Sequence, residues 1–358
     1  EQAFRYRAQL GPLDDRGLVL GRHAATLLAE AGQRALVRSD VPATINLLER
    51  AVQLLPDGDP EAVASYPDLA SALTEAGDLE RAADLYAAAE ELGDEATQLR
   101  ARMRRISLEL MRGASMAVAA APMEECISEA ERLGDEAVLA EGLRRLGILS
   151  LWLGDNDRAD QLLRSSLDHA ESARDLQLID EAMFWIALIL LWGPMPVESA
   201  LRECRTLARS ASGQLTKVEL RVAEGALLGL TGDFEQARQL AAEGRQVLVE
   251  LGQRVQYASI GMAPAIIELL ADDAPAAERI LREGHEILED AGERGYLSTD
   301  TESFAAGTPN LAFSVQIRIS QHTATAVPPP MLANDSLLLS ESVYGATIGV
   351  AVAIGPLV

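Results

Sequence analysis

The sequence predicts an all-α protein, a solenoid built from stacked helical hairpins. Hydrophobic residues make up 48% of the chain and aromatic residues only 4%, a composition typical of Ala/Leu-rich helix packing rather than of a β-sandwich core. A turn of the Gly-Asp type also recurs about every 39 residues. Because unrelated turns would not stay in register over most of the chain, this recurrence predicts seven hairpins.

The turns pair a small or flexible residue with an aspartate or a proline. They lie at Ser39-Asp40, Gly77-Asp78, Gly154-Asp155, Gly193-Pro194, Gly232-Asp233 and Asp272-Asp273. The interval between the second and the third is about twice the others, and Gly113 lies near its middle. Glycine adopts the positive φ that ends a helix, and an aspartate side chain caps the next helix. Each turn therefore marks the middle of a hairpin.

The segment from Ala140 to Ala170 shows how one hairpin is built. Apolar and small residues recur from Leu143 at i, i+3, i+4 and i+7, the spacing of one helix face. Small residues would let the two helices approach closely: Gly147, Ala159 and Ser166. This is the construction of a tetratricopeptide-type hairpin, which must stack on copies of itself to bury its apolar face.

A small residue also recurs early in the second helix of the hairpins, which supports the same register. Its positions are Thr44, Ala82, Ala159, Ala237 and Ala277. A period above the usual tetratricopeptide length of about 34 residues indicates longer helices in the same architecture. We therefore expect a tetratricopeptide-like right-handed superhelix, with a generic helical bundle as the alternative.

Three regions are expected along the chain. Residues 1–22 form a lead-in helix from a missing upstream module, residues 23–299 form the repeat array, and residues 300–358 form an atypical tail. The tail holds only five charged residues. The stretch Phe313–Ser320 alternates apolar and polar residues, which predicts a strand. The tail either folds back as a short β-hairpin or is disordered, and the lack of any sheet before Thr299 favours disorder.

The charge of the chain excludes some classes of partner. Its formal net charge is −24, whereas nucleic acids and anionic membranes are bound by clustered Lys and Arg. The apolar segment Ala182–Trp192 is too short to span a bilayer, and it predicts a helix that is central in the array or lines an apolar groove. Cys126 and Cys204 lack paired spacing, which favours buried thiols in a reducing cytoplasm.

The sequence contains no catalytic motif. The single lysine, Lys217, is not part of a phosphate-binding Gly-Lys-Ser/Thr loop. His285-Glu286 begins like a zinc-protease helix, but position 289 is Glu, so the second ligand is missing. We therefore expect no catalytic residue, no cofactor and no metal, and a chain that is not itself an enzyme.

Binding residues are expected on the concave face, which the first helix of each tetratricopeptide hairpin lines. A Trp, an Arg and Met side chains there suit a protein or peptide partner, a small apolar inducer, or both. The candidates are Glu141, Arg144, Ile148, Trp152, Asp180, Met183 and Met262. The alternative is that these side chains only pack neighbouring repeats, which is the interpretation favoured for Trp185.

Four strings resemble one family of proteins: Glu1–Gly11, Val41–Pro56, Leu190–Val197 and Gly284–Thr299. They look like the C-terminal tetratricopeptide region of bacterial regulators that join a class III nucleotide cyclase domain to an AAA (STAND-type) ATPase, akin to the LuxR-type large ATP-binding regulators. The resemblance covers residues 1–299 and implies that ATPase and cyclase modules lie upstream. It implies no catalytic residue in this chain.

After Thr299 the sequence departs from this family, and a frameshifted or fused segment fits the composition of the tail. Up to that point the resemblance implies a sensing and interaction arm of a cytoplasmic signalling ATPase, with that upstream ATPase module among its partners. The alternative function is a pure assembly scaffold with no sensing role.

Overall fold

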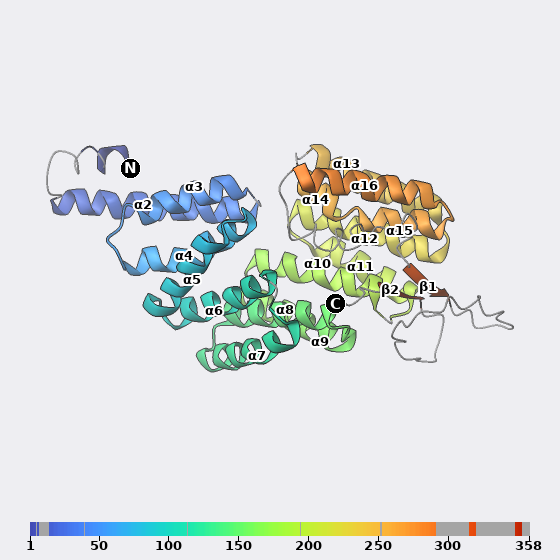
Figure 1. The fold of residues 1–358 in the computed structure, drawn as a ribbon, viewed down its shortest axis with the longest axis horizontal. Coiled ribbons are helices and arrows are strands. Elements are labelled where there is room, and N and C mark those ends of the chain that lie inside the picture. Colours follow the sequence, from blue (N-terminus) through green and yellow to red (C-terminus); the bar gives the residue numbers. More distant parts are fainter. Residues whose placement is uncertain are drawn as a thin grey trace. The chain divides into compact units, whose positions relative to one another are not determined.

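The computed structural model is a succession of antiparallel helical hairpins (Figure 1). It describes residues 1–4, 6, 14–38, 40–112, 114–193, 195–250, 253–290, 315–319 and 348–352. The chain divides into two compact units, Glu1–Ile179 (unit 1) and Asp180–Val358 (unit 2). The predicted all-α, tetratricopeptide-like solenoid is confirmed.

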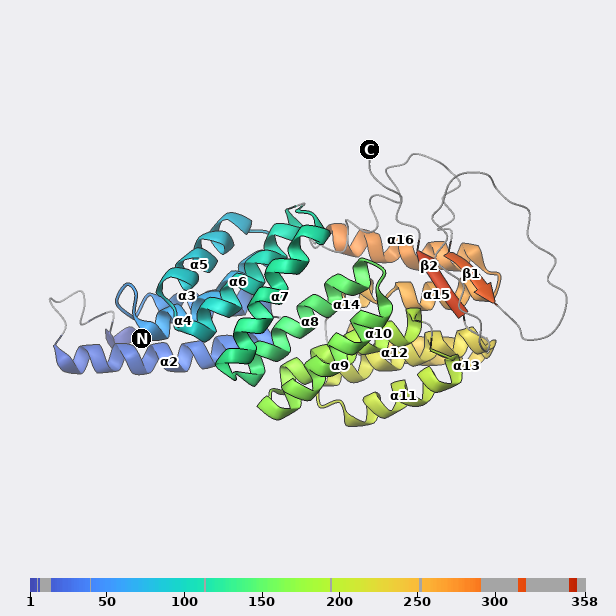
Figure 2. The same ribbon diagram turned by 90° about the horizontal axis from the view of Figure 1, so that it is seen from below.

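Unit 1 contains four helical hairpins and the first residues of α10. The helices are α2 (Asp15–Val37), α3 (Val41–Val52), α4 (Pro60–Glu75), α5 (Leu79–Leu92), α6 (Glu95–Met111), α7 (Met116–Leu133), α8 (Glu136–Trp152), α9 (Asn156–Ala173) and α10 (Leu176–Trp192). The helices α2, α4, α6 and α8 each pack on the odd-numbered helix that follows, and α4 also packs on α6 and α6 on α8 (Figure 2). The predicted end of a lead-in helix near Gly11 lies outside the described residues.

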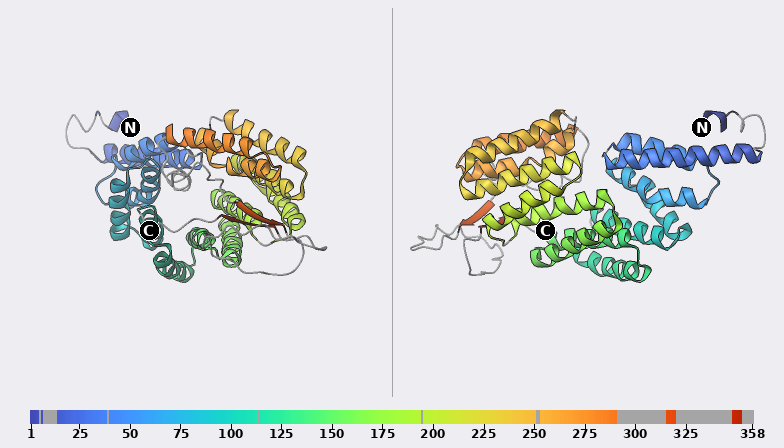
Figure 3. Two further views of the ribbon diagram at one scale, coloured as in Figure 1. Left: turned by 45° about the vertical axis from the view of Figure 1, so that its right-hand side comes forward. Right: turned by 180° about the vertical axis from the view of Figure 1, so that it is seen from behind.

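Unit 2 continues the hairpins from Asp180 and ends in a strand pair. Its helices after α10 are α11 (Val197–Ser210), α12 (Gln214–Thr231), α13 (Phe234–Glu250), α14 (Arg254–Ser259), α15 (Met262–Leu270) and α16 (Ala274–Asp290). The strands β1 (Val315–Ile319) and β2 (Ile348–Val352) pair antiparallel, with Ile317 opposite Val350 (Figure 3, red). β1 lies within the stretch predicted to be a strand; the rest of the tail lies outside the described residues.

The recurring turns have the predicted chemistry. Gly77, Gly154 and Gly232 adopt φ of 81°, 82° and 88°, values that a side chain would strain. The aspartates that follow cap the next helices; Asp155, for example, accepts a hydrogen bond of 3.1 Å from the backbone N–H of Arg158. The turn between α10 and α11 differs, because α11 follows Pro196 without a side-chain cap.

The seventh hairpin has a broken first helix, which the spacing of the sequence did not reveal. α14 ends at Ser259 and α15 begins at Met262. Pro264 lacks an N–H, and its ring would clash with the carbonyl of Ile260 in a continuous helix. The proline therefore favours a break at this point, although Pro67 and Pro122 lie inside the continuous helices α4 and α7.

The recurring small residues lie where the helices of a hairpin meet. The five predicted positions are at most 1% exposed: Thr44, Ala82, Ala159, Ala237 and Ala277. In the hairpin of α8 and α9, a Cβ added to Gly147 would lie 2.8 Å from Cγ of Leu163, and the Ser166 hydroxyl donates a 2.7 Å hydrogen bond to the Ala140 carbonyl. The predicted close approach of the two helices is confirmed.

This contact gives a direct test of the register. Replacing Ala159 with leucine should lower the free energy of unfolding by about 1–3 kcal/mol, because the added atoms have no room between α8 and α9. Gln161 is exposed on the same helix, so Gln161→Leu serves as the control and should leave stability nearly unchanged. Urea unfolding of both variants measures the difference, and equal effects would contradict the register.

The apolar segment of α10 is largely buried. Ala182, Ile186 and Leu190 are at most 2% exposed, and the expected position, central in the array or along an apolar groove, stays a prediction. No helix in the part of the chain that the structure describes is both long and apolar enough to cross a membrane.

Candidate functional site

The residues predicted to line a groove differ widely in exposure. Three are buried: Glu141, Ile148 and Met183. Three are half-buried: Arg144, Asp180 and Met262. Trp152, at the end of α8, is 56% exposed. That these side chains contact a ligand stays a prediction, and Trp152 is the one that a partner can reach most easily.

Two of these residues belong to a longer series of polar side chains on the first helices. The series, here called the polar ladder, repeats every 36 to 39 residues: Asp68, Arg104, Glu141, Asp180, Glu219 and Gln256. The first three lie in unit 1 on α4, α6 and α8, and the others lie in unit 2 on α10, α12 and α14. Each unit therefore places three polar side chains on successive first helices.

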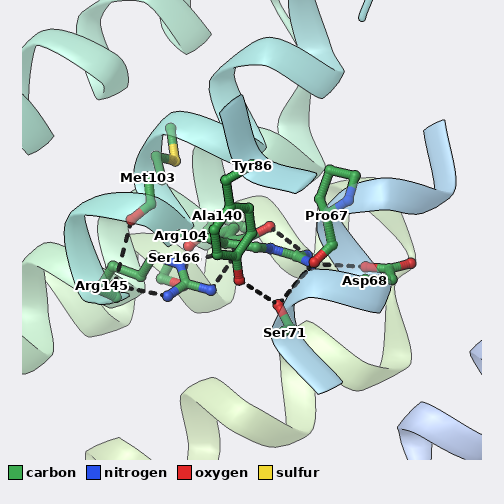
Figure 4. Close-up of polar contacts among 11 residues, drawn as sticks. Pro67, Asp68, Ser71, Tyr86, Met103, Arg104, Ala140, Arg145 and Ser166 are labelled. Atoms are coloured by element: carbon green, nitrogen blue, oxygen red, sulfur yellow. Dashed lines mark hydrogen bonds and ion pairs between the residues drawn. The ribbon is translucent and has the colours of Figure 1, made fainter. Parts of the chain in front are cut away.

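In unit 1 the ladder is an ion-pair network centred on Arg104 (Figure 4). The guanidinium of Arg104 donates to Glu141 over 2.7 Å from Nε and 3.1 Å from Nη2. Its Nη1 donates to Asp68 over 2.7 Å and to the Ser71 hydroxyl over 3.3 Å. The Ser71 hydroxyl also shares a 3.1 Å hydrogen bond with that of Tyr86. One arginine thus joins three consecutive hairpins.

A second arginine completes the charge balance around Glu141. Arg145, four residues later on α8, donates to Glu141 Oε1 over 2.9 Å and 3.1 Å, and to the Ser107 hydroxyl over 2.9 Å. Burial alone would raise the pKa of Glu141, but the charges of Arg104 and Arg145 together hold it well below its usual value. Glu141 is therefore an anion at neutral pH.

In unit 2 the ladder is acidic. Asp180 accepts hydrogen bonds from the N–H of Gly213 (2.8 Å) and the hydroxyl of Ser212 (3.0 Å), just before α12. A Cβ on Gly213 would lie 2.5 Å from Asp180 Oδ2, so a side chain there would displace the carboxylate from this position. Asp180 thereby holds the start of α12 against α10.

Glu219 is the buried member of this acidic part. It is 9% exposed and accepts a hydrogen bond from the side-chain amide of Gln256 on α14. The pKa of Glu219 is raised to about 8. Burial raises it most, the hydrogen bond from Gln256 lowers it, and the charge of Asp180 raises it. At neutral pH this carboxyl group is mostly protonated.

The two cysteines and the possible metal ligands are the other candidate functional groups within the described ranges. Cys126 and Cys204 are buried free thiols, as predicted, and burial raises the pKa of Cys204 to about 12, far from that of a nucleophile. Among the residues described, no group of three His, Cys, Asp or Glu side chains is placed to hold a metal ion.

Comparisons with known proteins agree on the architecture. No protein-family description matches the sequence, and no curated protein matches it. A Rap protein complexed with competence and sporulation factor is similar in structure, with a TM-score of 0.60, 13% identity and 76% of each chain covered. The fold is that of a tetratricopeptide-like solenoid.

Two further solved structures share this solenoid. One is the Rap conjugation gene regulator of plasmid pLS20 in complex with the Phr* peptide, with a TM-score of 0.58, 14% identity, and 73% of this chain and 72% of that chain covered. The other is the apo quorum sensor NprR from B. thuringiensis, with a TM-score of 0.50, 14% identity, and 80% and 86% covered. At such low identities the likeness concerns the fold alone.

Sequence reasoning found two members of the polar ladder and missed the other four. Glu141 and Asp180 were placed by extending the turn register back into the first helices. The same register, followed in both directions, leads to the missed positions: Asp68, Arg104, Glu219 and Gln256. The signal was missed because the residue type changes from repeat to repeat while only the polarity persists.

Proposed function

We propose that the chain is a protein- or peptide-binding arm of a regulatory protein, with the partner lying along the first helices. The main support is the network of Arg104, which fixes the first helices of three hairpins in unit 1 relative to one another. On α8, the same helix carries Arg144 and the exposed Trp152. Arg and Trp are enriched in binding hot spots, and a preorganised surface loses less entropy on binding.

A more specific role follows from the resemblance of residues 1–299 to cyclase–ATPase regulators. In this more specific role, the chain senses a partner or apolar inducer in the cytoplasm and passes the signal to an upstream ATPase module. The partner would stabilise one of two packings of the array and so shift their populations. The solved structures named above include a conjugation gene regulator in complex with the Phr* peptide and a Rap protein complexed with competence and sporulation factor, which supports this class of role. The division into residues 1–22, 23–299 and 300–358 belongs to the same proposal.

The surface on α8 can be tested by substitution. The double variant Arg144→Ala/Trp152→Ala should lose at least tenfold in affinity for peptides selected on the wild-type chain from a random peptide library, while its circular dichroism stays unchanged. Val249 is as exposed as Trp152, and Arg282 is exposed; both lie on second helices. The control variant is therefore Val249→Ala/Arg282→Ala, which should bind normally.

Equal binding by the two double variants would place the site elsewhere. A sensor and a scaffold differ in a second measurement, made on the full-length protein. A selected peptide should change its ATPase rate if the chain is a sensor and leave the rate unchanged if it is a scaffold.

A further inference from the structure

Glu219 is a buried carboxyl group that has no cationic partner in the part of the chain that the structure describes. It is more than nine-tenths buried, and its one hydrogen bond within the described residues comes from a neutral amide, that of Gln256. A buried ionisable group usually has a partner of opposite charge, because removing a charge from water costs far more than a single neutral hydrogen bond returns. Glu219 therefore differs from an ordinary structural ion pair.

Glu141 serves as an internal reference for Glu219. Both lie on the first helix of their hairpin at the same ladder position, and both are less than 10% exposed. The preceding ladder residue is Arg104 for Glu141 but Asp180 for Glu219. Four residues further along the helix, Glu141 has Arg145, whereas Glu219 has the buried Ala223. Both positions that supply positive charge in unit 1 lack it in unit 2.

The cations on the helices around α12 are engaged elsewhere or face solvent. The pairs are Arg205–Glu224, Arg221–Glu243, Arg238–Glu268 and Arg245–Glu283. Lys217 of α12 and Arg254 of α14 are exposed. The charged group that acts on Glu219 is Asp180 of α10, which is itself an acid. No cation of the described chain thus neutralises this position.

We propose that Glu219 is the anchor for a cationic group of the partner, a guanidinium or a primary amine, which takes the place that arginine side chains occupy around Glu141. Gln256 holds one carboxylate oxygen, and the second oxygen remains for the incoming N–H. Asp180 adds negative charge nearby. The inference specifies the partner chemistry of the proposed function, and it rests on that function only in assuming that a partner reaches the first helices.

Binding at this position is linked to a proton. In the free protein at neutral pH the carboxyl group of Glu219 holds its proton, since its pKa is about 8. A bound cation favours the carboxylate, so the proton leaves to solvent as the cation binds. Affinity for a cation should therefore fall as the pH falls below 8, by about 15-fold between pH 8 and pH 6.5 for one linked proton.

The test uses a small probe, so that it does not depend on knowing the partner. Binding of n-butylguanidinium and of its neutral analogue n-butylurea is measured by NMR titration on the 358-residue chain, at constant ionic strength and at pH 8 and pH 6.5. The variant is Glu219→Gln, which keeps the shape and the hydrogen bond to Gln256. The control is Glu224→Gln, five residues later on α12, where the carboxylate already pairs with Arg205 at 2.7 Å.

The wild type and Glu224→Gln should bind the guanidinium at least tenfold more tightly than the urea at pH 8, and more weakly at pH 6.5. Glu219→Gln should lose both the preference and the pH dependence. A second variant, Ala223→Arg, supplies the cation that Arg145 supplies to Glu141 and should block the probe. Equal binding of the two probes to the wild type, or unchanged guanidinium binding to Glu219→Gln, would overturn the inference. Either failure leaves the peptide test on Arg144 and Trp152 unaffected.

Discussion

Replacing Glu141 with alanine should lower the free energy of unfolding by about 3–5 kcal/mol, the range found when one partner of a buried ion pair is removed. The variant leaves the guanidinium groups of Arg104 and Arg145, whose side chains are 14% and 18% exposed, without Glu141, and Asp68 is then the remaining acid that Arg104 contacts. Their charges then repel one another in a poorly solvated site. The loss should therefore exceed that expected for the missing side-chain volume.

An exposed pair in the same unit provides the control for this variant. Arg102 and Glu129 pair at 3.0 Å between α6 and α7, and each side chain is 36% exposed. Exposed pairs contribute at most about 1 kcal/mol, so Glu129→Ala should cost little. Urea unfolding of both variants at pH 7 measures the contrast. Similar losses would show that the network around Glu141 is worth no more than a surface pair.

Replacing Glu219 with glutamine should stabilise the protein, and the gain should grow with pH. The folded protein raises the pKa of Glu219 from 4.5 to about 8, so the folded state binds this proton more tightly than the unfolded state does. Stability from this group is fully present below pH 4.5 and is lost as the pH rises through 8. The wild type should lose roughly 4–5 kcal/mol over that range, a loss that glutamine avoids because it does not ionise.

Unfolding measured at pH 6 and at pH 9 tests this expectation. The advantage of Glu219→Gln over the wild type should increase by roughly 3 kcal/mol between these two values. Glu224→Gln, on the same helix but paired with Arg205, should show no such increase. Stability curves of the wild type and Glu219→Gln that run parallel with pH would mean that the carboxyl group of Glu219 titrates normally.

The architecture could be predicted from the sequence because it depends on local chemistry repeated at a fixed period. Gly154 ends a helix through its own backbone freedom, and Asp155 caps the next helix with its own side chain. The small side chain of Ala159 can be read directly from the sequence, and its burial follows from its position relative to the turn. Each of these signals belongs to residues within one hairpin, so counting along the chain was sufficient.

The candidate site could be predicted only in part, because its properties depend on residues one repeat apart. Glu141 and Glu219 are the same residue type at the same ladder position, yet the pKa of one is lowered and that of the other is raised. The difference comes from two guanidinium groups near Glu141 that have no counterpart near Glu219 among the residues described. Arg104 pairs with Glu141 from the neighbouring helix α6, and Arg145 pairs with it from the same helix. Likewise, the break between α14 and α15 could not be predicted from the spacing of the turns, because it lies within one helix of a hairpin and leaves that spacing unchanged.

The contacts of Arg104 have a consequence for how unit 1 opens. A solenoid in which each repeat contacts only its neighbours unfolds as a chain of nearly independent links. Here one guanidinium binds acids on the hairpins before and after its own, Asp68 and Glu141. If the hairpin that carries Asp68 or the one that carries Glu141 detaches, the guanidinium of Arg104 loses one of its two acidic partners. Fraying of unit 1 is therefore resisted at α4 and at α8, and its last three hairpins, α4–α5, α6–α7 and α8–α9, should open together as one cooperative block.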